Sequence, residues 1–365
     1  MDYSGEGEVL GMSKIPSAEE QLDFLTKVQR LFNESDFSST YKYALLISLA
    51  DLAIELGKDD DSELELTNRQ IAERFIELYW QQSSPYKTSK ANDSGVLYQN
   101  HGTQAAIIRA IQAFRDENSF NSPNAAKHSK EYKKLVTTVA GTVAKQPINY
   151  LQNVGGGTLP FLYERNTSSI TLKIGAAYCL RRFQPLVQQL ARSRWTDYIK
   201  KNAKNMPILG EKDDLSSFLF ETSRKTLVQI CKSLKEVYGN KCFYCHKATS
   251  KLEVDHFIPF SLYPRDLMHN FVLACPNCNR SKSDTLAAKE YLDMWIKLIR
   301  QHSNEMIRIG ERVGVPADLE TSLAIAKWGY GMATDTRVTF WMISHIKRVL
   351  GNKIKGFNDV IENQE

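Results

Sequence analysis

Two cysteine pairs constrain the fold of this chain more than any other feature of its sequence. Cys242-Phe-Tyr-Cys245 and Cys275-Pro-Asn-Cys278 are separated by 29 residues. Thiolates at this spacing converge on one zinc ion at about 2.3 Å, and two such pairs complete a closed tetrahedral site. A redox CxxC motif is the main rival, but it needs only one pair. The spacing therefore favours a structural zinc held by all four cysteines, with a folded insert between the pairs.

The chain as a whole has the composition of a globular protein. Its 365 residues, 42% of them apolar, allow two or three domains. The sequence has no long apolar run, and its start, MDYSGEGEVLGM, lacks the pattern of a secretory signal. We therefore expect a cytoplasmic protein without a membrane contact, and disorder over residues 1–14. Cys179 and Cys231 lie in apolar helical contexts and are expected to be buried thiols.

The pattern of apolar residues predicts a mainly α protein. Residues 15–205 are expected to form a mainly helical recognition or sensor domain containing a small β-hairpin around Arg165-Asn166-Thr167. Capping boxes at Ser17 and Thr67 begin two of its helices, and Pro185 is expected to kink or split a third. A linker over 206–215 follows. Residues 216–300 are expected to form the zinc domain, and 301–365 to form helices that pack on it.

Two features of the first 205 residues leave their role open. Helices followed by a hairpin fit either a winged-helix DNA reader or a purely structural bundle. Residues 181–205 carry seven Lys or Arg against one acid, together with Trp195 and Tyr198. This segment fits a surface that follows phosphates, and it fits equally well a helix with a solvated basic face.

The insert between the cysteine pairs carries polar side chains that could perform chemistry. Asp255 and His256 end one expected strand, Asn270 precedes another, and Asn279 lies in the first turn of an expected helix. Neighbours on a strand point to opposite faces, so Asp255 and His256 are not expected to pair with each other. The order is therefore strand, loop, strand and helix, joined at both ends by one zinc site.

The segments CFYC, VDHFIPFS, HNFVLACPNCN and RSK resemble those of HNH endonucleases. These enzymes are a branch of the His-Me finger (ββα-metal) nucleases, here in the form with a four-cysteine zinc site. The resemblance covers about residues 235–290. It implies a ββα-metal finger, which would make the fold a helical N-terminal domain, a zinc-stabilised finger and C-terminal helices.

The resemblance also implies roles for individual residues. Asp255 and Asn279 would hold a catalytic Mg²⁺ or Mn²⁺ ion through oxygen atoms, as such hard cations prefer. His256 would act as general base on the attacking water. Asn270 would orient the imidazole or brace its loop, while Arg280 and Lys282 would grip phosphates. His269 precedes Asn270 and is expected to be structural.

The implied activity is metal-dependent hydrolysis of phosphodiester bonds, in DNA rather than RNA. The layout, a finger after a large helical region, is similar to that of bacterial restriction or anti-phage HNH proteins. A homodimer or a partner protein of a defence system is compatible with this interpretation. The alternatives are a structure-specific or homing-type nuclease, and a zinc-stabilised DNA-binding module without activity.

Overall fold

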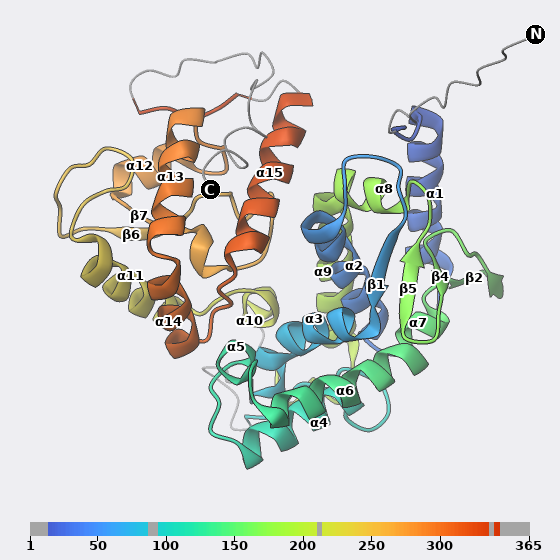
Figure 1. Cartoon of the computed structure of the whole chain (residues 1–365). Helices are drawn as coiled ribbons and strands as arrows, with labels where there is room; N and C mark the ends of the chain where they lie inside the picture. The colour runs from blue at the N-terminus through green and yellow to red at the C-terminus, as the bar shows by residue number, and fades with distance from the viewer. Residues whose placement is uncertain (1–13, 87–93, 210–213, 336–338, 344–365) are drawn as a thin grey trace, which may run out of the picture.

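The computed structural model describes residues 14–86, 94–209, 214–335 and 339–343, and these residues fold around two hydrophobic cores (Figure 1). The first core is built from residues between Phe24 and Leu219. The second is built mainly from residues between Ile230 and Trp341. We refer to the two parts as the N-terminal unit and the C-terminal unit. Within the described residues, no helix has the length and apolar character needed to span a membrane.

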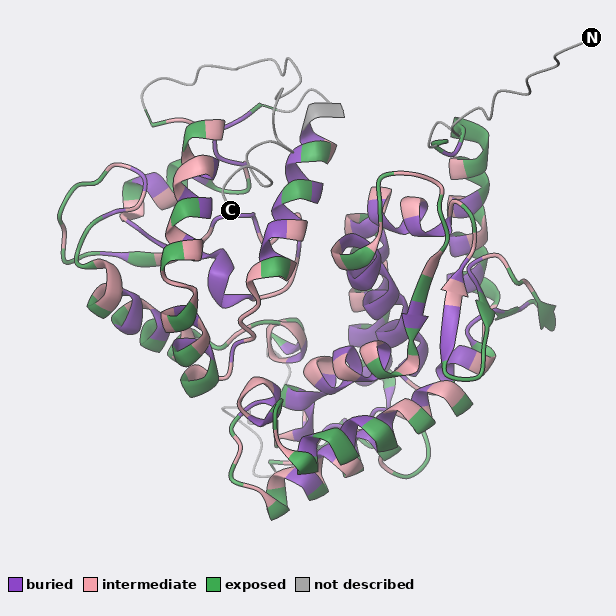
Figure 2. Cartoon of the chain, viewed as in Figure 1, coloured by how far each residue is buried: buried purple, intermediate pink, exposed green. Residues whose placement is uncertain are grey.

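The N-terminal unit is mainly helical, as expected. Helix α2 lies at its centre, and residues 41–54 of this helix are all buried (Figure 2). Helices α8 and α9 pack on α2 from one direction, and α3 packs on it from another. The helices are α1 (Ala18–Glu34), α2 (Tyr41–Leu56), α3 (Asn68–Trp80), α4 (Ala106–Glu117), α5 (Pro123–Ala126), α6 (Lys130–Lys145), α7 (Pro147–Tyr150), α8 (Ala176–Arg182), α9 (Gln184–Lys201) and α10 (Leu215–Phe220), with a short 3₁₀ turn, η1 (Gln81–Ser83), after α3.

Local sequence signals set the ends of several helices. Both capping boxes are present: Ser17 and Thr67 each accept a hydrogen bond from the backbone three residues on. The expected split at Pro185 is also confirmed, because α8 ends at Arg182 and α9 begins at Gln184. Proline is tolerated in the first turn of a helix but not in its interior.

Two small sheets complete the N-terminal unit. The first has the strand order β1-β5-β4, with β1 at Leu64–Thr67, β4 at Tyr163–Arg165 and β5 at Ser169–Leu172. All its pairs are antiparallel, so the expected β4–β5 hairpin is extended by a strand from much earlier in the chain. The second sheet pairs β2 (Asn153–Val154) with β3 (Gly157–Thr158). Gly155 and Gly156 have positive φ angles of 60° and 77° at its turn.

The C-terminal unit contains one antiparallel strand pair covered by helices. Strand β6 (Glu253–His256) pairs with β7 (Phe271–Ala274), and α12 (Pro276–Lys282) follows directly. This is the strand, loop, strand and helix order expected of the finger. The remaining elements are α11 (Arg224–Tyr238), η2 (Met268–Asn270), α13 (Lys289–Gln301), α14 (Ser303–Val313) and α15 (Leu319–Asp335).

The packing differs from the expected organisation in three places. Helix α10 packs on α9, and its Leu215 and Leu219 belong to the first core rather than to the zinc domain. Helices are expected over 301–365, but residues 336–338 and 344–365 lie outside the described residues, and the described residues 339–343 are not helical. In the basic segment 181–205, Trp195 and Tyr198 are buried, so their rings do not interleave with basic side chains on the surface.

The two units contact each other through α2 and through the loop that joins β6 to β7. Helix α15 packs on α2, and Ile54 of α2 belongs to the second core. Arg265, in the β6–β7 loop, lies 2.9 Å from Glu55 and 2.7 Å from Glu77, with side-chain exposures of 15%, 5% and 27%. Arg74 pairs with the same two carboxylates. A half-buried network of two arginines and two glutamates thus joins the units.

Candidate functional site

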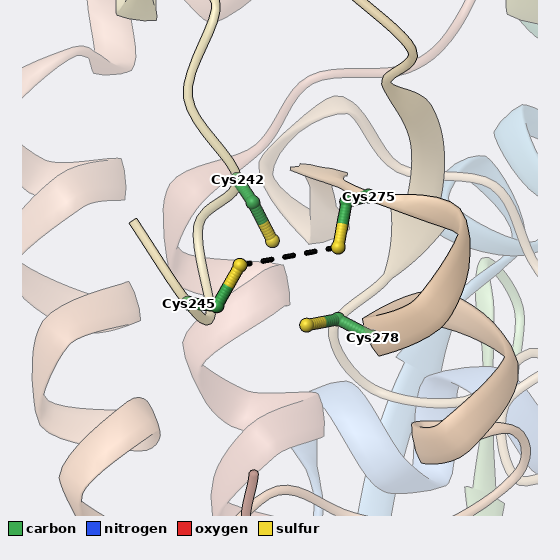
Figure 3. A group of neighbouring side chains, drawn as sticks. All are labelled: Cys242, Cys245, Cys275 and Cys278. Atoms are coloured by element: carbon green, nitrogen blue, oxygen red, sulfur yellow. Dashed lines mark hydrogen bonds between the residues drawn. The ribbon is translucent and has the colours of Figure 1, made fainter. Parts of the chain in front are cut away.

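The four cysteines come together from the two ends of the finger (Figure 3). Cys242 and Cys245 lie before β6, while Cys275 and Cys278 lie at the start of α12. Their sulfur atoms are all within 4.8 Å of one another, and the Cys245 and Cys275 sulfurs are 3.9 Å apart. Ligands at about 2.3 Å from a tetrahedral zinc would lie roughly 3.8 Å apart. The cluster therefore fits a structural zinc, with no position left for a reacting water.

His256 ends β6, opposite Phe271 in β7. Its imidazole Nε2 lies 2.6 Å from a carboxylate oxygen of Asp266, and its ring packs against Phe260 and Phe271. Asp266 also accepts a hydrogen bond of 3.0 Å from the backbone N–H of Thr222. Three neighbours thus fix the orientation of the ring, while its side chain keeps 23% exposure.

The environment of Asp266 favours its ionised form. Burial alone would raise its pKa, but the hydrogen bond and charge of His256 and the Thr222 donor together lower the pKa below its ordinary value. An ionised carboxylate can only accept hydrogen bonds, so Nε2 of a neutral His256 must carry the proton. The lone pair of such an imidazole is then on Nδ1, as a general base requires.

Asp255 points away from His256 and is 7% exposed. Its carboxylate accepts a hydrogen bond of 2.6 Å from the Tyr244 hydroxyl and lies 3.3 Å from the ammonium of Lys282. Burial raises the pKa of Asp255, whereas Lys282 and Tyr244 act to lower it. Asp255 and His256 therefore have separate partners, as the alternation of side chains along a strand predicts.

Lys282 does not lie where a phosphate-binding residue is expected. It is 0% exposed, and its ammonium donates a hydrogen bond of 2.7 Å to the carbonyl oxygen of His256. Burial lowers the pKa of Lys282, and Asp255 opposes this effect. The side chain holds α12 against the end of β6, which excludes contact with a phosphate in this conformation. Arg280 on the same helix is exposed and remains available for that contact.

Asn279 lies in α12 beside the outer part of β6. Its amide nitrogen donates a hydrogen bond of 2.8 Å to Glu253, two residues before Asp255 and so on the same face of the strand. Within the described residues, no hydrogen bond involves the side-chain Oδ1 of Asn279. Asp255, Glu253 and Asn279 thus place oxygen donors on one side of β6. Such a set suits a hard divalent cation better than a soft one.

Asn270 braces the loop after His256. Its amide group accepts from the Ile258 N–H at 2.7 Å and donates to the Ile258 carbonyl at 2.9 Å. Of its two expected roles, this is the bracing one. His269 is buried, burial lowers its pKa to about 4, and its Nε2 lies 3.0 Å from Ser303. Its position in the second core agrees with the expected structural role.

Two family matches cover separate stretches of the chain. Residues 21–219, more than half of the chain, match a family described as a domain of unknown function, DUF8808. The chain belongs to this family. Residues 242–285 match the HNH endonuclease family. The chain matches no curated protein and no solved structure.

The HNH match begins at the first cysteine of the cluster and includes His256, Asn270 and Asn279. The DUF8808 match ends within α10, close to the boundary between the two cores. Three site residues were missed by sequence reasoning: Tyr244, Glu253 and Asp266. Of these three, only Glu253 could have been predicted from the sequence, because alternation along the strand places it on the same face as Asp255. Tyr244 and Asp266 reach the site through the folding of loops, which periodicity does not predict.

Proposed function

We propose that this protein is a metal-dependent endonuclease that hydrolyses phosphodiester bonds in DNA. The observation that carries the proposal is the arrangement around β6. His256 is held by Asp266 on one side of the strand, and the oxygen donors Asp255 and Asn279 lie on the other. A base and a cation site separated by one strand width can act on the same phosphate.

The side chains then have distinct tasks. Asp266 accepts the Nε2–H of His256, so Nδ1 takes a proton from the attacking water as its oxygen bonds to phosphorus. The bond from phosphorus to the 3′ oxygen breaks, and that oxygen takes a proton from solvent. Mg²⁺ or Mn²⁺ bound by Asp255 and Asn279 would offset negative charge on the phosphate. Lys282 keeps Asp255 and the end of β6 in place, and Arg280 is free to contact the substrate backbone.

Plasmid DNA with Mg²⁺ tests this proposal. We expect the wild-type protein to nick or linearise the plasmid, and His256→Ala to be slower by roughly 10²- to 10⁴-fold, the usual contribution of a general base. His101→Ala removes an exposed histidine of the N-terminal unit and should cleave like wild type. EDTA should abolish cleavage. Equal cleavage by wild type and His256→Ala would refute the enzyme, and DNA binding without any cleavage would favour a non-catalytic module.

The layout of the chain supports a role in restriction or anti-phage defence. A finger of this kind reads only the phosphate backbone, so target choice requires other parts of the chain. Here the DUF8808 region precedes the finger and is several times longer. Phage infection of cells that express wild type or His256→Ala tests the role: protection that depends on His256 supports it, and equal phage yields contradict it.

A further inference from the structure

The N-terminal unit has the connectivity of a winged-helix domain. Helix α2 leads into β1, helices α3, α4 and α6 follow, and the hairpin β4–β5 comes after them. Strand β1 pairs with β5, the second strand of the hairpin, giving the order β1-β5-β4. In winged-helix domains the last helix before such a hairpin faces outward and reads DNA. The four-residue helix α7 and the β2–β3 pair lie between α6 and the hairpin here, so the corresponding long helix is α6, which Figure 1 shows at the edge of the unit.

Helix α6 has one buried face and one polar face. The buried residues Tyr132, Val136, Val139 and Val143 recur at spacings of three and four, and the helix packs on α3 and α4. The exposed face runs along the whole helix, as Figure 2 also shows. Its members are Lys130, Glu131, Lys133, Lys134, Thr137, Thr138, Gly141 and Lys145.

The exposed face carries a net positive charge. Residues 127–146 contain five lysines and one acid, Glu131. Among the described residues, no ion pair involves any of these lysines. A face that keeps its lysines free of internal partners is suited to an external polyanion.

Gly141 gives a second, independent indication of a partner on this face. Glycine weakens a helix interior relative to alanine, so its presence there needs a reason. Internal packing supplies none, because a Cβ at Gly141 would meet nothing within 4 Å. It lies between Thr138 and Lys145 on the polar face. A glycine with open space above it allows a partner to approach the helix backbone closely.

The β4–β5 turn adds polar groups near the C-terminal end of this helix. Residues 164–168, Glu-Arg-Asn-Thr-Ser, are all exposed. Arg165 hydrogen-bonds to Asn149 of α7, the short helix that follows α6. The turn is therefore tied to the C-terminal end of α6. This is the position in which a wing contacts a phosphate backbone beside the groove occupied by a helix.

We propose that α6 is a recognition helix that enters the major groove of duplex DNA, with the β4–β5 turn on the adjacent backbone. The major groove admits an α-helix. Lysines at both ends of α6 would contact phosphates, and Thr137, Thr138 and Gly141 would face the base edges. This surface is separate from the nuclease site, so it would bring DNA to the chain even if the finger were inactive.

Duplex DNA binding by the full-length His256→Ala protein tests the inference apart from cleavage. Fluorescence anisotropy should be measured with a labelled duplex over a range of salt concentrations. Lys134→Ala/Lys145→Ala in this background should weaken binding roughly 10- to 60-fold near 0.1 M salt and lower the salt slope by about 2. The control, Lys27→Ala/Lys58→Ala, removes a half-exposed lysine of α1 and an exposed lysine after α2, and it should change neither quantity.

Gly141→Ala tests the close approach of DNA to the α6 backbone without changing the charge of the protein. The added methyl group should weaken duplex binding several-fold while leaving the thermal midpoint of the protein unchanged or higher, since it clashes with nothing in the chain. Binding by the α6 variants equal to that of the parent, or a loss matched by the control pair, overturns the inference. So does stronger competition by RNA than by duplex DNA. None of these results bears on whether wild type cleaves a plasmid.

Discussion

The chemistry of the site depends on which nitrogen of His256 carries its proton. Asp266 decides this, because its carboxylate lies 2.6 Å from Nε2 and its pKa is lowered despite burial. The same carboxylate is held by the Thr222 N–H, so the base is oriented from outside the strand that carries it. In the proposed mechanism Asp266 touches no reacting atom and acts by positioning His256.

Replacing Asp266 should slow turnover without removing substrate binding. In Asp266→Asn the amide can present its N–H to Nε2, which favours the tautomer with the proton on Nδ1. The neutral amide also holds the imidazole ring less firmly. We expect kcat to fall roughly 10- to 100-fold, less than in His256→Ala, with KM little changed. Steady-state cleavage measures both constants. Asp293→Asn, an exposed pair partner of Lys289, is the control, and a fall in kcat of equal size there would contradict the role of Asp266.

A second buried carboxyl makes the stability of the N-terminal unit depend on pH. Asp51 is 4% exposed, and burial raises its pKa to about 7. The charges of Arg74 and Arg192 act to lower this pKa, whereas the charge of Glu55 acts to raise it. The side chains of Gln184 and Gln188 donate hydrogen bonds to the carboxylate. Between about pH 4 and pH 7 the folded state keeps a proton that the unfolded chain has lost. Stability should therefore decrease as pH rises through this window and level off above it.

Asp51→Asn should remove that pH dependence. A neutral amide cannot ionise, so the variant should gain stability over wild type as pH rises, by at most about 4 kcal/mol for a shift of roughly three units. Urea unfolding at pH 5 and pH 8 measures the difference. Asp197→Asn, on the exposed face of α9, should behave like wild type at both values. A gain for Asp51→Asn that is the same at pH 5 and pH 8 would rule out the titration of Asp51.

At the scale of elements, we expect the stability of the finger to depend more on a bound zinc ion than on its strands. Strands β6 and β7 have four residues each, which is too little for a stable sheet alone. The four cysteines join the segment before β6 to the start of α12. Binding a zinc ion that the unfolded chain binds weakly contributes directly to folding free energy.

Chelation of zinc should therefore unfold the finger and spare the N-terminal unit, which has a core of its own. We expect Cys275→Ser, or wild type with a strong chelator, to show two separate thermal transitions, the lower one restored by zinc. Zinc content and calorimetry measure this. Cys231→Ser changes a half-buried thiol outside the cluster and should keep both zinc and a normal profile. Retention of normal stability by Cys275→Ser would exclude the zinc clamp.

Local signals in the sequence predicted most elements but not the way they pack. Capping boxes at Ser17 and Thr67, the split at Pro185 and the β4–β5 hairpin each depend on residues close in sequence, and all are present. The pairing of β1 with β5 joins residues about 100 positions apart, and no local pattern specifies it. The basic segment 181–205 shows the same limit, because its charge gave no indication that Trp195 would be buried.

In the candidate site, too, the sequence indicated residues on short local segments but not contacts that depend on the path of the chain. Asp255, His256, Asn270 and Asn279 lie on short segments that resemble those of HNH endonucleases, so the resemblance singled them out as candidates. Lys282 was misassigned because the sequence places it beside Arg280, whereas the turn of α12 directs it inward to Asp255. Asp266 was missed because its role depends on the path of the loop over residues 257–267 across the N-terminal unit.

At the scale of the whole molecule, the loop that carries Asp266 is also the main polar contact between the units. Arg265 bonds Glu55 and Glu77, Tyr263 donates a hydrogen bond of 2.7 Å to Glu55, and Arg192 donates one of 2.6 Å to the Pro264 carbonyl. Three consecutive residues before Asp266 thus contact helices of the DUF8808 region. The position of His256, the proposed general base, is therefore tied to the unit that we propose reads DNA.

Arg265→Met tests this connection, because it leaves two half-buried glutamates sharing Arg74 alone. Breaking a buried ion pair by removing one partner typically costs about 3–5 kcal/mol. We expect a lower thermal midpoint and slower cleavage, with zinc content unchanged. Adding Glu77→Gln restores the balance of one arginine to one carboxylate and should recover part of both losses. Arg308→Met, on the exposed face of α14, is the control. If Arg265→Met cleaves DNA at the wild-type rate, the contact between the units holds them together without positioning His256.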